Sequence, residues 1–348
     1  MYIGNNEINA VYLGSEEITK IYQGNTVIYE KGGEPEPLDP TVPLTFEITG
    51  NGNIVWKASI GLFKTIEYKL NDGEWISIES NTGTSAPSIS VAVGDIIQFR
   101  GNNAQYCYHY GNSYYDNTFS DSTAQFKTYG NIMSLINSIN FSGLTTLQSA
   151  TTFYGLFSNC TGLTDASELL LPVTTVAEDC YNGMFQNCTS LTTAPQLPAT
   201  TVAGRCYRGM FQNCTSLTTA PELPATSLAQ SCYQNMFSGC TSLTTAPQLP
   251  ATTLASFCYA NMFDSCTGLT TAPELPATTL INVCYANMFA GCSNLNYIKC
   301  LATDISANVC TRNWLNGVAS SGTFVTPSTT NWSTDTSGIP SGWTRVDA

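Results

Sequence analysis

The stretch CYRGMFQNC spans residues 206–214, and the chain returns to nearly the same nine residues five times. The copies begin at positions 180, 206, 232, 258 and 284, so they recur every 26 residues. Between successive copies runs a segment of the form T-[SG]-L-T-T-A-P-[QE]-L-P-A-T-[TS]-[LV]. A fixed period of about 20 to 50 residues predicts a solenoid, in which each repeat forms one coil of a stacked array.

The nine-residue stretch has the apolar pattern of an amphipathic helix. At about 100° per residue, its apolar and sulfur side chains fall within an arc of about 140°, opposite the polar residues. The arc contains Cys206, Tyr207, Met210, Phe211 and Cys214. Pro221 and Pro224 exclude a helix from the segment that follows, which we expect to be extended. Each unit is therefore predicted to contain one helix and one extended segment.

The paired cysteines of each unit are open to several interpretations: a metal array, a disulfide framework, a reactive thiol or a packed core. On a helix, Cys206 and Cys214 lie about 12 Å apart, whereas the Cα atoms of a disulfide lie at most about 7 Å apart. Zinc sites favour closely spaced cysteines or histidine partners, and the chain has one histidine. A reactive thiolate needs positive charge nearby, and only Arg205 and Arg208 are basic across the five units. We expect buried free thiols, with disulfides between neighbouring units as the alternative.

A ten-residue repeat occupies the start of the chain, where Tyr2, Tyr12 and Tyr22 each begin a Tyr-x-Gly unit. Short β-rich segments separated by glycine turns predict a β-meander over residues 1–30. So small a meander buries little surface alone, and we expect it to anchor the chain to another protein. The sequence KGGEPEPLDPTVP at 31–43 predicts a linker.

Residues 44–129 have the pattern of a series of short strands separated by turn residues. The sequence Asn71-Asp72-Gly73 predicts a hairpin between two of them. This spacing predicts an antiparallel, immunoglobulin-like β-sandwich.

The repeat array is expected over residues 130–318, and its terminal units depart from the consensus. TFYGLFSNC has Thr152 in place of the first cysteine, and CTRNWLNGV has Val318 in place of the second. Such departures are typical of capping repeats. Residues 319–348 are predicted to form a C-terminal cap.

The repeat also carries a family resemblance. The stretch MF-x-x-C-T-S-L-T-T-A-P-x-L-P-A-T-T-L-A resembles the BspA-like branch of leucine-rich-repeat proteins, through the aromatic residue before the cysteine, the C-T-S-L-T motif and the L-P pair. The resemblance covers residues 131–318 and implies a right-handed solenoid with an adhesive or binding role and no catalytic residues. The Tyr-x-Gly meander separately resembles N-terminal segments of phage virion proteins.

The predicted fold class is mixed β and α/β. It comprises an N-terminal β-meander, an antiparallel β-sandwich and a leucine-rich-repeat-like solenoid with caps.

The amino-acid composition argues against some classes of binding partner. Charged residues make up 11% of the chain, and the formal net charge is −13. An acidic chain repels phosphate backbones, which argues against a nucleic-acid partner. There is no run of about 18 apolar residues, so we expect no membrane insertion. The first residues lack the regions of a signal peptide, so we expect the protein to stay where it is made or to be released inside a virion.

Two threonines stand next to each other in each extended segment. Adjacent residues of a strand face opposite ways, so one threonine of each pair is expected to form an exposed stripe. The candidate ligand-binding residues of this stripe are Thr193, Thr219, Thr245 and Thr271. The stripe is either a flat, uncharged face for a sugar or a protein, or a solvated ladder without a ligand.

A second group of candidates lies in QYCYHYGNSYYDNTF, residues 105–119, for which we expect a strand followed by a loop. Tyr110, Tyr114 and Tyr115 are candidate ligand-binding residues, because aromatic rings near Asn and Asp suit sugar rings. The alternative is that one aromatic face is sandwich core and that the loop packs on the solenoid.

No enzyme motif stands out. The chain has no GxSxG, HExxH or P-loop sequence, and Cys107 and His109 form a Cys–His pair without an orienting third group. We expect no catalytic residue, no cofactor and no metal site.

The expected function is that of a non-enzymatic, virion-associated decoration or fibre protein of a bacteriophage, which displays the solenoid to a glycan or protein of the host surface. Its expected partners are this host ligand and, through residues 1–30, other virion proteins; a homo-oligomer is a further expectation. The expected location is the virion. The alternative is a leucine-rich-repeat adhesin on the bacterial cell surface.

Overall fold

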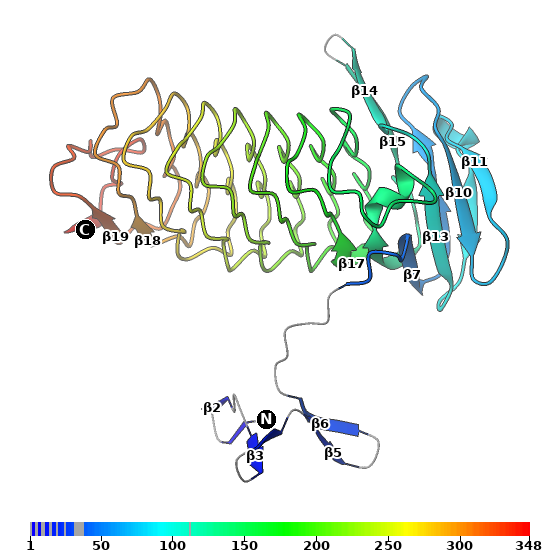
Figure 1. Cartoon of the computed structure of the whole chain (residues 1–348). Coiled ribbons are helices and arrows are strands. Elements are labelled where there is room, and N and C mark those ends of the chain that lie inside the picture. The colour runs from blue at the N-terminus through cyan, green and yellow to red at the C-terminus, as the bar shows by residue number, and fades with distance from the viewer. Residues whose placement is uncertain are drawn as a thin grey trace. The chain divides into compact units, whose positions relative to one another are not determined.

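The computed structural model describes residues 38–110 and 113–348, together with the backbone of six short strands among the first 37 residues (Figure 1). The chain divides into two compact units, Met1–Asp39 and Pro40–Ala348. The regular secondary structure of the described residues is mostly β-sheet, and none of the sheets closes on itself. Each unit is described by itself below.

The first unit contains three antiparallel strand pairs, one for each ten-residue repeat. The pairs are β1 (Tyr2–Ile3) with β2 (Asn6–Glu7), β3 (Val11–Leu13) with β4 (Glu16–Ile18), and β5 (Lys20–Gln23) with β6 (Thr26–Glu30). Each described strand of this unit pairs with one partner, which gives three hairpins where the sequence predicted a β-meander. Most of the predicted linker, residues 31–37, lies outside the described residues.

The second unit begins with a β-rich region of short strands in series, as the sequence predicts. Its strands are β7 (Leu44–Gly50), β8 (Gly52–Val55), β9 (Lys57–Ala58), β10 (Thr65–Leu70), β11 (Ile76–Glu79), β12 (Ser88–Val91), β13 (Ile96–Gly101), β14 (Cys107–Tyr110), β15 (Ser113–Thr118) and β16 (Gln125–Asn131). The strand β15 occupies the sequence that was expected to be a loop.

One six-stranded sheet joins this region to the repeats. Its order is β11-β10-β13-β7-β16-β17, where β17 (Leu163–Leu170) belongs to the repeat region and pairs in parallel with β16. The other pairs in the sheet are antiparallel. Two smaller sheets, β12-β8 and β14-β15-β9, complete the region. Its core is aromatic: the Phe46 ring lies 4.8 Å from Phe99 and 4.5 Å from Phe126.

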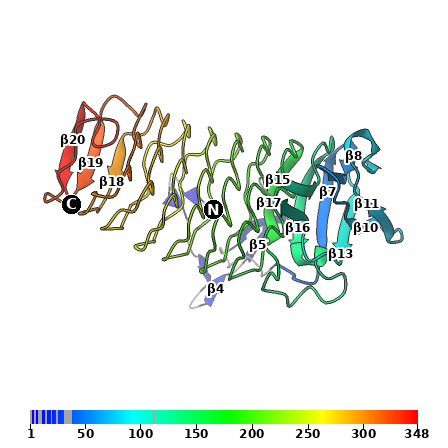
Figure 2. The same cartoon turned by 90° about the horizontal axis from the view of Figure 1, so that it is seen from above.

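Beyond β17, successive 26-residue segments stack side by side in parallel register (Figures 1 and 2). Main-chain hydrogen bonds join each segment, called a coil below, to the next. The N–H of Tyr181 donates to the carbonyl of Cys206 at 3.0 Å, for example, and the N–H of Phe185 to that of Met210 at 2.9 Å. A parallel sheet of β18 (Tyr297–Lys299), β19 (Gly322–Thr326) and β20 (Trp343–Asp347) closes the C-terminal end.

The predicted helix in each unit is wrong. Among residues 38–110 and 113–348 the helical elements are two short 3-10 helices, η1 (Gly83–Ser85) and η2 (Ile132–Leu135). The nine-residue stretches are instead chains of tight turns with alternating hydrogen bonds. The N–H of Met210 donates to the Tyr207 carbonyl within the same coil, whereas the N–H of Phe211 donates to the Met236 carbonyl of the next coil.

The turns arise because every fourth residue adopts a left-handed backbone conformation. In one coil these residues are Arg205, Gly209 and Asn213, with φ of 55°, 58° and 60°. A left-handed residue in every turn excludes an α-helix, and Gly and Asn tolerate that conformation best. The turns still bury every fourth side chain, so Cys206, Met210 and Cys214 are all fully buried. A turn chain and a helix therefore bury the same residues, and their apolar patterns look alike.

Two columns of stacked aromatic rings run through the coils. One contains the phenylalanines of the turn segments, whose neighbouring centroids lie 5.3–5.7 Å apart; its members are Phe157, Phe185, Phe211, Phe237, Phe263 and Phe289. The other runs from Phe153 through Tyr181, Tyr207, Tyr233, Tyr259 and Tyr285 to Trp314. Trp332 of the C-terminal segment stacks on Trp314 at 5.4 Å and covers the end of this column.

The prediction of buried free thiols is confirmed. All fourteen cysteines are free and buried. The second cysteine of each unit also donates a hydrogen bond to a phenylalanine carbonyl of the preceding coil, as Cys214 does to Phe185 at 3.1 Å and Cys240 to Phe211 at 3.1 Å. Burial raises the pKa of these thiols, in the case of Cys240 to about 12, so they remain protonated and packed.

Candidate functional site

The hairpin of β14 and β15 separates the three candidate tyrosines. Tyr114 pairs across the hairpin with His109, whereas Tyr115 pairs with Tyr108. Since adjacent residues of a strand face opposite ways, Tyr114 and Tyr115 lie on different faces. Tyr110 is 70% exposed near the hairpin turn. The structure therefore does not bring the three together, and Tyr114 alone faces a hollow.

Tyr114 forms the middle of a stack of three rings. Its ring centroid lies 4.5 Å from that of His109 and 4.2 Å from that of Tyr154. Tyr154 comes from TFYGLFSNC, the first turn segment of the repeats. Burial raises the pKa of both phenols, so they remain neutral. The stack joins the hairpin to the coils and presents an aromatic wall.

Beside this wall, the turns of the first coils form a groove of about 270 Å³. Its lining is aromatic at one side and otherwise consists of amides, glycines and one guanidinium: Tyr114, Tyr154, Asn182, Gly183, Gln186, Arg208, Gly209, Gln212 and Asn235. The side-chain amide of Gln186 donates to that of Gln212 in the next coil at 2.9 Å. The groove thus combines a flat apolar surface with paired donors and acceptors.

The floor of the groove is open because glycine occupies the middle left-handed position of the first coils. Gly183 and Gly209 have φ of 60° and 58°. A Cβ on Gly209 would lie 3.3 Å from Oε1 of Gln212, inside the groove. From Asn235 onward asparagine takes the same position in the same backbone conformation. The groove therefore belongs to the first coils and ends where glycine gives way to asparagine.

The two arginines beside the groove differ in their partners. Arg205 binds both carboxylate oxygens of Asp179, with its Nη2 2.9 Å from Oδ2, and also lies 2.8 Å from Glu178. Arg208 lines the groove and forms no ion pair with any residue in the described part of the chain. Its guanidinium is the charge that a bound molecule would meet.

The chain matches no protein-family model, no curated protein and no solved structure. The candidate site is therefore supported by its geometry.

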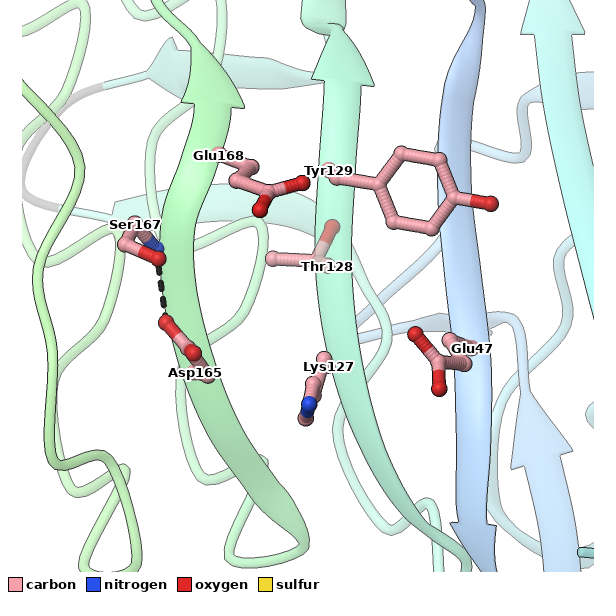
Figure 3. A pocket seen from close by; sticks show the side chains of 7 residues that line it. All are labelled: Glu47, Lys127, Thr128, Tyr129, Asp165, Ser167 and Glu168. Carbon is pink, nitrogen blue, oxygen red and sulfur yellow. Dashed lines mark hydrogen bonds between the residues drawn. The ribbon is translucent and has the colours of Figure 1, made fainter. Parts of the chain in front are cut away.

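A second hollow lies on the six-stranded sheet (Figure 3). Glu47 of β7, Lys127 and Tyr129 of β16, and Asp165 and Glu168 of β17 line it. Its volume is about 70 Å³, which is room for about two water molecules. Within residues 38–110 and 113–348, no cluster of three or more metal-ligating side chains is suited to hold an ion. This hollow is too small for a sugar. Two other hollows, one beside Lys57 and Asp116 and one beside Glu67 and Asn103, have volumes of about 270 and 360 Å³ but contain no aromatic side chain. The groove is the candidate site because of its aromatic wall.

The threonines occupy another part of each coil. Thr193, Thr219 and Thr245 form consecutive parallel bridges, and Thr271 bridges Tyr297 of β18. The four candidate threonines are exposed as expected, but the expected alternation within each pair is wrong, because both threonines are exposed in all four pairs. These residues form isolated bridges rather than regular strands, so the alternation of faces does not apply. None of the four lines the groove.

Cys107 and His109, the Cys–His pair of the sequence, have structural roles. Cys107 is buried, and burial together with the charge of Asp116 raises the pKa of its thiol, so it is not a thiolate. The ring of His109 stacks on that of Tyr114. No helix in residues 38–110 and 113–348 is long and apolar enough to cross a bilayer.

The sequence interpretation missed most of the groove. Tyr154, Arg208, Gln186 and Gln212 occupy the polar positions of the repeat, which on a helix would simply face solvent. The available signal was the change from CYNG and CYRG in the first two copies to CYQN and CYAN in the later three. That change marks where the groove ends.

Proposed function

We propose that the chain is a non-enzymatic glycan-binding protein, and that its repeats form a leucine-rich-repeat-like solenoid that presents the groove to a host surface. The observation that carries the proposal is the groove itself, with an aromatic wall, a glycine floor and amides from three successive coils. Sugar rings have apolar faces that pack on aromatic rings and hydroxyls that pair with amides. The groove volume of about 270 Å³ suits one or two sugar rings better than a protein surface.

The solenoid and its family remain part of the proposal. The stacked 26-residue coils and their continuous aromatic columns support a solenoid whose coils are equivalent and contact their neighbours. The repeat sequence supports the BspA-like branch of leucine-rich-repeat proteins. Such a solenoid holds the groove on a rigid body, which lowers the entropic cost of binding.

The setting that we propose is a bacteriophage virion, as a decoration or fibre protein. Its support is the resemblance of the Tyr-x-Gly repeats to N-terminal segments of virion proteins, and the separation of residues 1–39 from the remainder of the chain as their own unit. In this proposal the three hairpins bind other virion proteins, and copies of the chain form a homo-oligomer through them. The alternative is an adhesin on the bacterial cell surface.

Filling the groove is expected to abolish glycan binding without unfolding the protein. In the double variant Gly183→Asn and Gly209→Asn, the new side chains occupy the groove floor. Asparagine already adopts this backbone conformation at Asn235 and Asn261, with φ of 57° and 54°. We expect affinity for glycans on an array to fall about 100-fold or more, because the volume needed by the sugar is lost. The melting temperature should stay within a few degrees.

The reverse exchange provides the control. Asn261→Gly changes the same coil position outside the groove, so binding should not change. Glycan binding that persists in the filled variant would show that the groove is not the binding site.

Deleting residues 1–30 is expected to release the protein from its particle while the rest stays folded. Two-stranded hairpins are marginal alone, so we expect them to fold against a partner. The full chain and the 31–348 fragment would be expressed during phage growth and measured by mass spectrometry in purified particles. Particles should contain the full chain and lack the fragment. Equal incorporation would contradict the anchor, and full chain in the bacterial envelope fraction alone would favour the adhesin.

A further inference from the structure

One charged side chain, that of Arg208, lines the groove without an acidic partner among the described residues. We infer that the groove selects an acidic saccharide. The guanidinium of Arg208 binds a sugar carboxylate while the sugar ring packs on Tyr114. This inference rests on the proposed glycan-binding function and names the class of glycan. It concerns the same groove and adds the group that discriminates between ligands.

Arg205 and Arg208 differ in whether they have an acidic partner. The two residues lie in one turn segment, but Arg205 is bound by Asp179 and Glu178. Arg208 has no such partner among the described residues and is directed to the groove, whose other lining residues are uncharged. A planar guanidinium with free donors binds a carboxylate through two parallel hydrogen bonds.

The aromatic wall lies within reach of the same charge. Burial and the negative charge of Asp179 raise the pKa of Tyr114, and the positive charges of Arg205 and Arg208 act against this rise. Arg208 and Tyr114 both line the groove, so one ligand can contact both. A monosaccharide with a carboxyl group presents both features, an apolar ring face and an anion at its edge.

The acidity of the whole chain does not prevent this binding. The net charge of −13 acts at long range, and physiological salt screens it beyond about 8 Å. Near the groove, Arg205 binds both Asp179 and Glu178 and offsets one of their two negative charges. The local interaction with Arg208 therefore determines whether an acidic or a neutral sugar is preferred.

Equivalent positions in different coils provide two matched variants for the test, one inside the groove and one outside it. Position 208 in its coil corresponds to Gln234 in the next coil and to Arg312 in the last. Arg208→Gln therefore installs a residue that the neighbouring coil already holds. Arg312→Gln removes the same charge from an exposed site outside the groove. Both variants are expected to fold.

The experiment is calorimetric titration of the full chain with acidic sugars and their neutral counterparts. The probes are oligosaccharides that contain glucuronic, galacturonic or N-acetylneuraminic acid, the same compounds with the carboxyl reduced to an alcohol, and a hexose phosphate. At least one carboxylated probe should bind about 10-fold or more tightly than its reduced form. Arg208→Gln should remove this difference, and Arg312→Gln should preserve it.

Each other outcome has a distinct meaning. Equal binding of acidic and reduced forms, still lost on filling the groove, would overturn the acidic assignment and leave the glycan-binding function standing. Tighter binding of the hexose phosphate than of every carboxylated probe would overturn the carboxylate as the recognised anion. No binding of any saccharide would overturn both the inference and the proposed function. Loss of the preference in Arg312→Gln as well would show that general charge, rather than the groove, selects the ligand.

Discussion

Raising the pH from about 8 to about 10 is expected to unfold the repeats at room temperature. Fourteen thiols are buried without a cation beside them, and burial raises their pKa, for Cys240, Cys284, Cys292 and Cys300 to about 12. A raised pKa in the fold stabilises the protein below the pKa of the unfolded chain, 9.0, and this stabilisation is lost as the pH rises above that value.

The expected loss is large because the thiols act together. One pH unit above the unfolded pKa, each thiol costs about 1 kcal/mol of stability. Ten such thiols cost on the order of 10 kcal/mol, which matches the whole stability of a typical protein, about 5–15 kcal/mol. The buried tyrosines of the aromatic column, such as Tyr207 and Tyr259, have raised pKa values for the same reason and add to the loss at higher pH.

Denaturant unfolding at a series of pH values, in the presence of a reducing agent, measures this effect. The free energy of unfolding should be flat to about pH 8 and fall steeply above 9, and at neutral pH the reducing agent should change nothing. The triple variant Cys214→Ala, Cys240→Ala and Cys266→Ala should start less stable but lose about 4 kcal/mol less per pH unit. A stability that stays level to pH 10.5 would mean that the thiols ionise within the fold.

Replacing Met236 and Phe237 together by alanine is expected to destabilise the array far more than Gln234→Ala. Both residues are fully buried, and the Phe237 ring stacks on Phe211 and Phe263 at 5.7 Å on each side. Large-to-small changes in a core cost about 2–5 kcal/mol each, so the pair costs about 4–10 kcal/mol. Gln234 is half-buried on the polar side of the turn, where a substitution changes stability by about 0.5 kcal/mol or little more.

The position of the double variant determines how the damage appears. In a stack in which each coil contacts its neighbours, a defect in a central coil weakens two interfaces at once. Calorimetry should show a broadened or split transition for the double variant and a single one for Gln234→Ala. Similar losses from both changes would contradict the assignment of the two faces of the turn segment.

The apolar pattern of the repeat predicted which side chains are buried but not the backbone that buries them. Cys206, Met210 and Cys214 recur every fourth residue, and this spacing fits a helix and a chain of turns almost equally well. The difference lies in Gly209 and Asn213, which adopt left-handed conformations with φ of 58° and 60°. In a single repeat these residues look like ordinary polar positions of a helix.

The candidate site was predictable only in part, because it combines two distant segments. Tyr114 stood out as one of a group of tyrosines, but the residues that complete the groove lie 40 to 121 positions further along, from Tyr154 to Asn235. They converge because β16 pairs with β17 and because the hairpin of β14 and β15 stacks on the first coil. The repeat pattern of the sequence cannot reveal such a junction, because one of the two segments that meet there lies before the first repeat.

The regular spacing of the aromatic columns means that each repeat adds nearly the same length to the array. From Phe185 to Phe289, neighbouring phenylalanine rings lie 5.4–5.7 Å apart, and each 26-residue unit adds one such step. The groove uses only the first coils, so gain or loss of a later unit by recombination between near-identical repeats would leave it unchanged. Such events would shift the C-terminal sheet along the axis in steps of one coil. Chains that differ by such events would differ in reach while keeping the same groove.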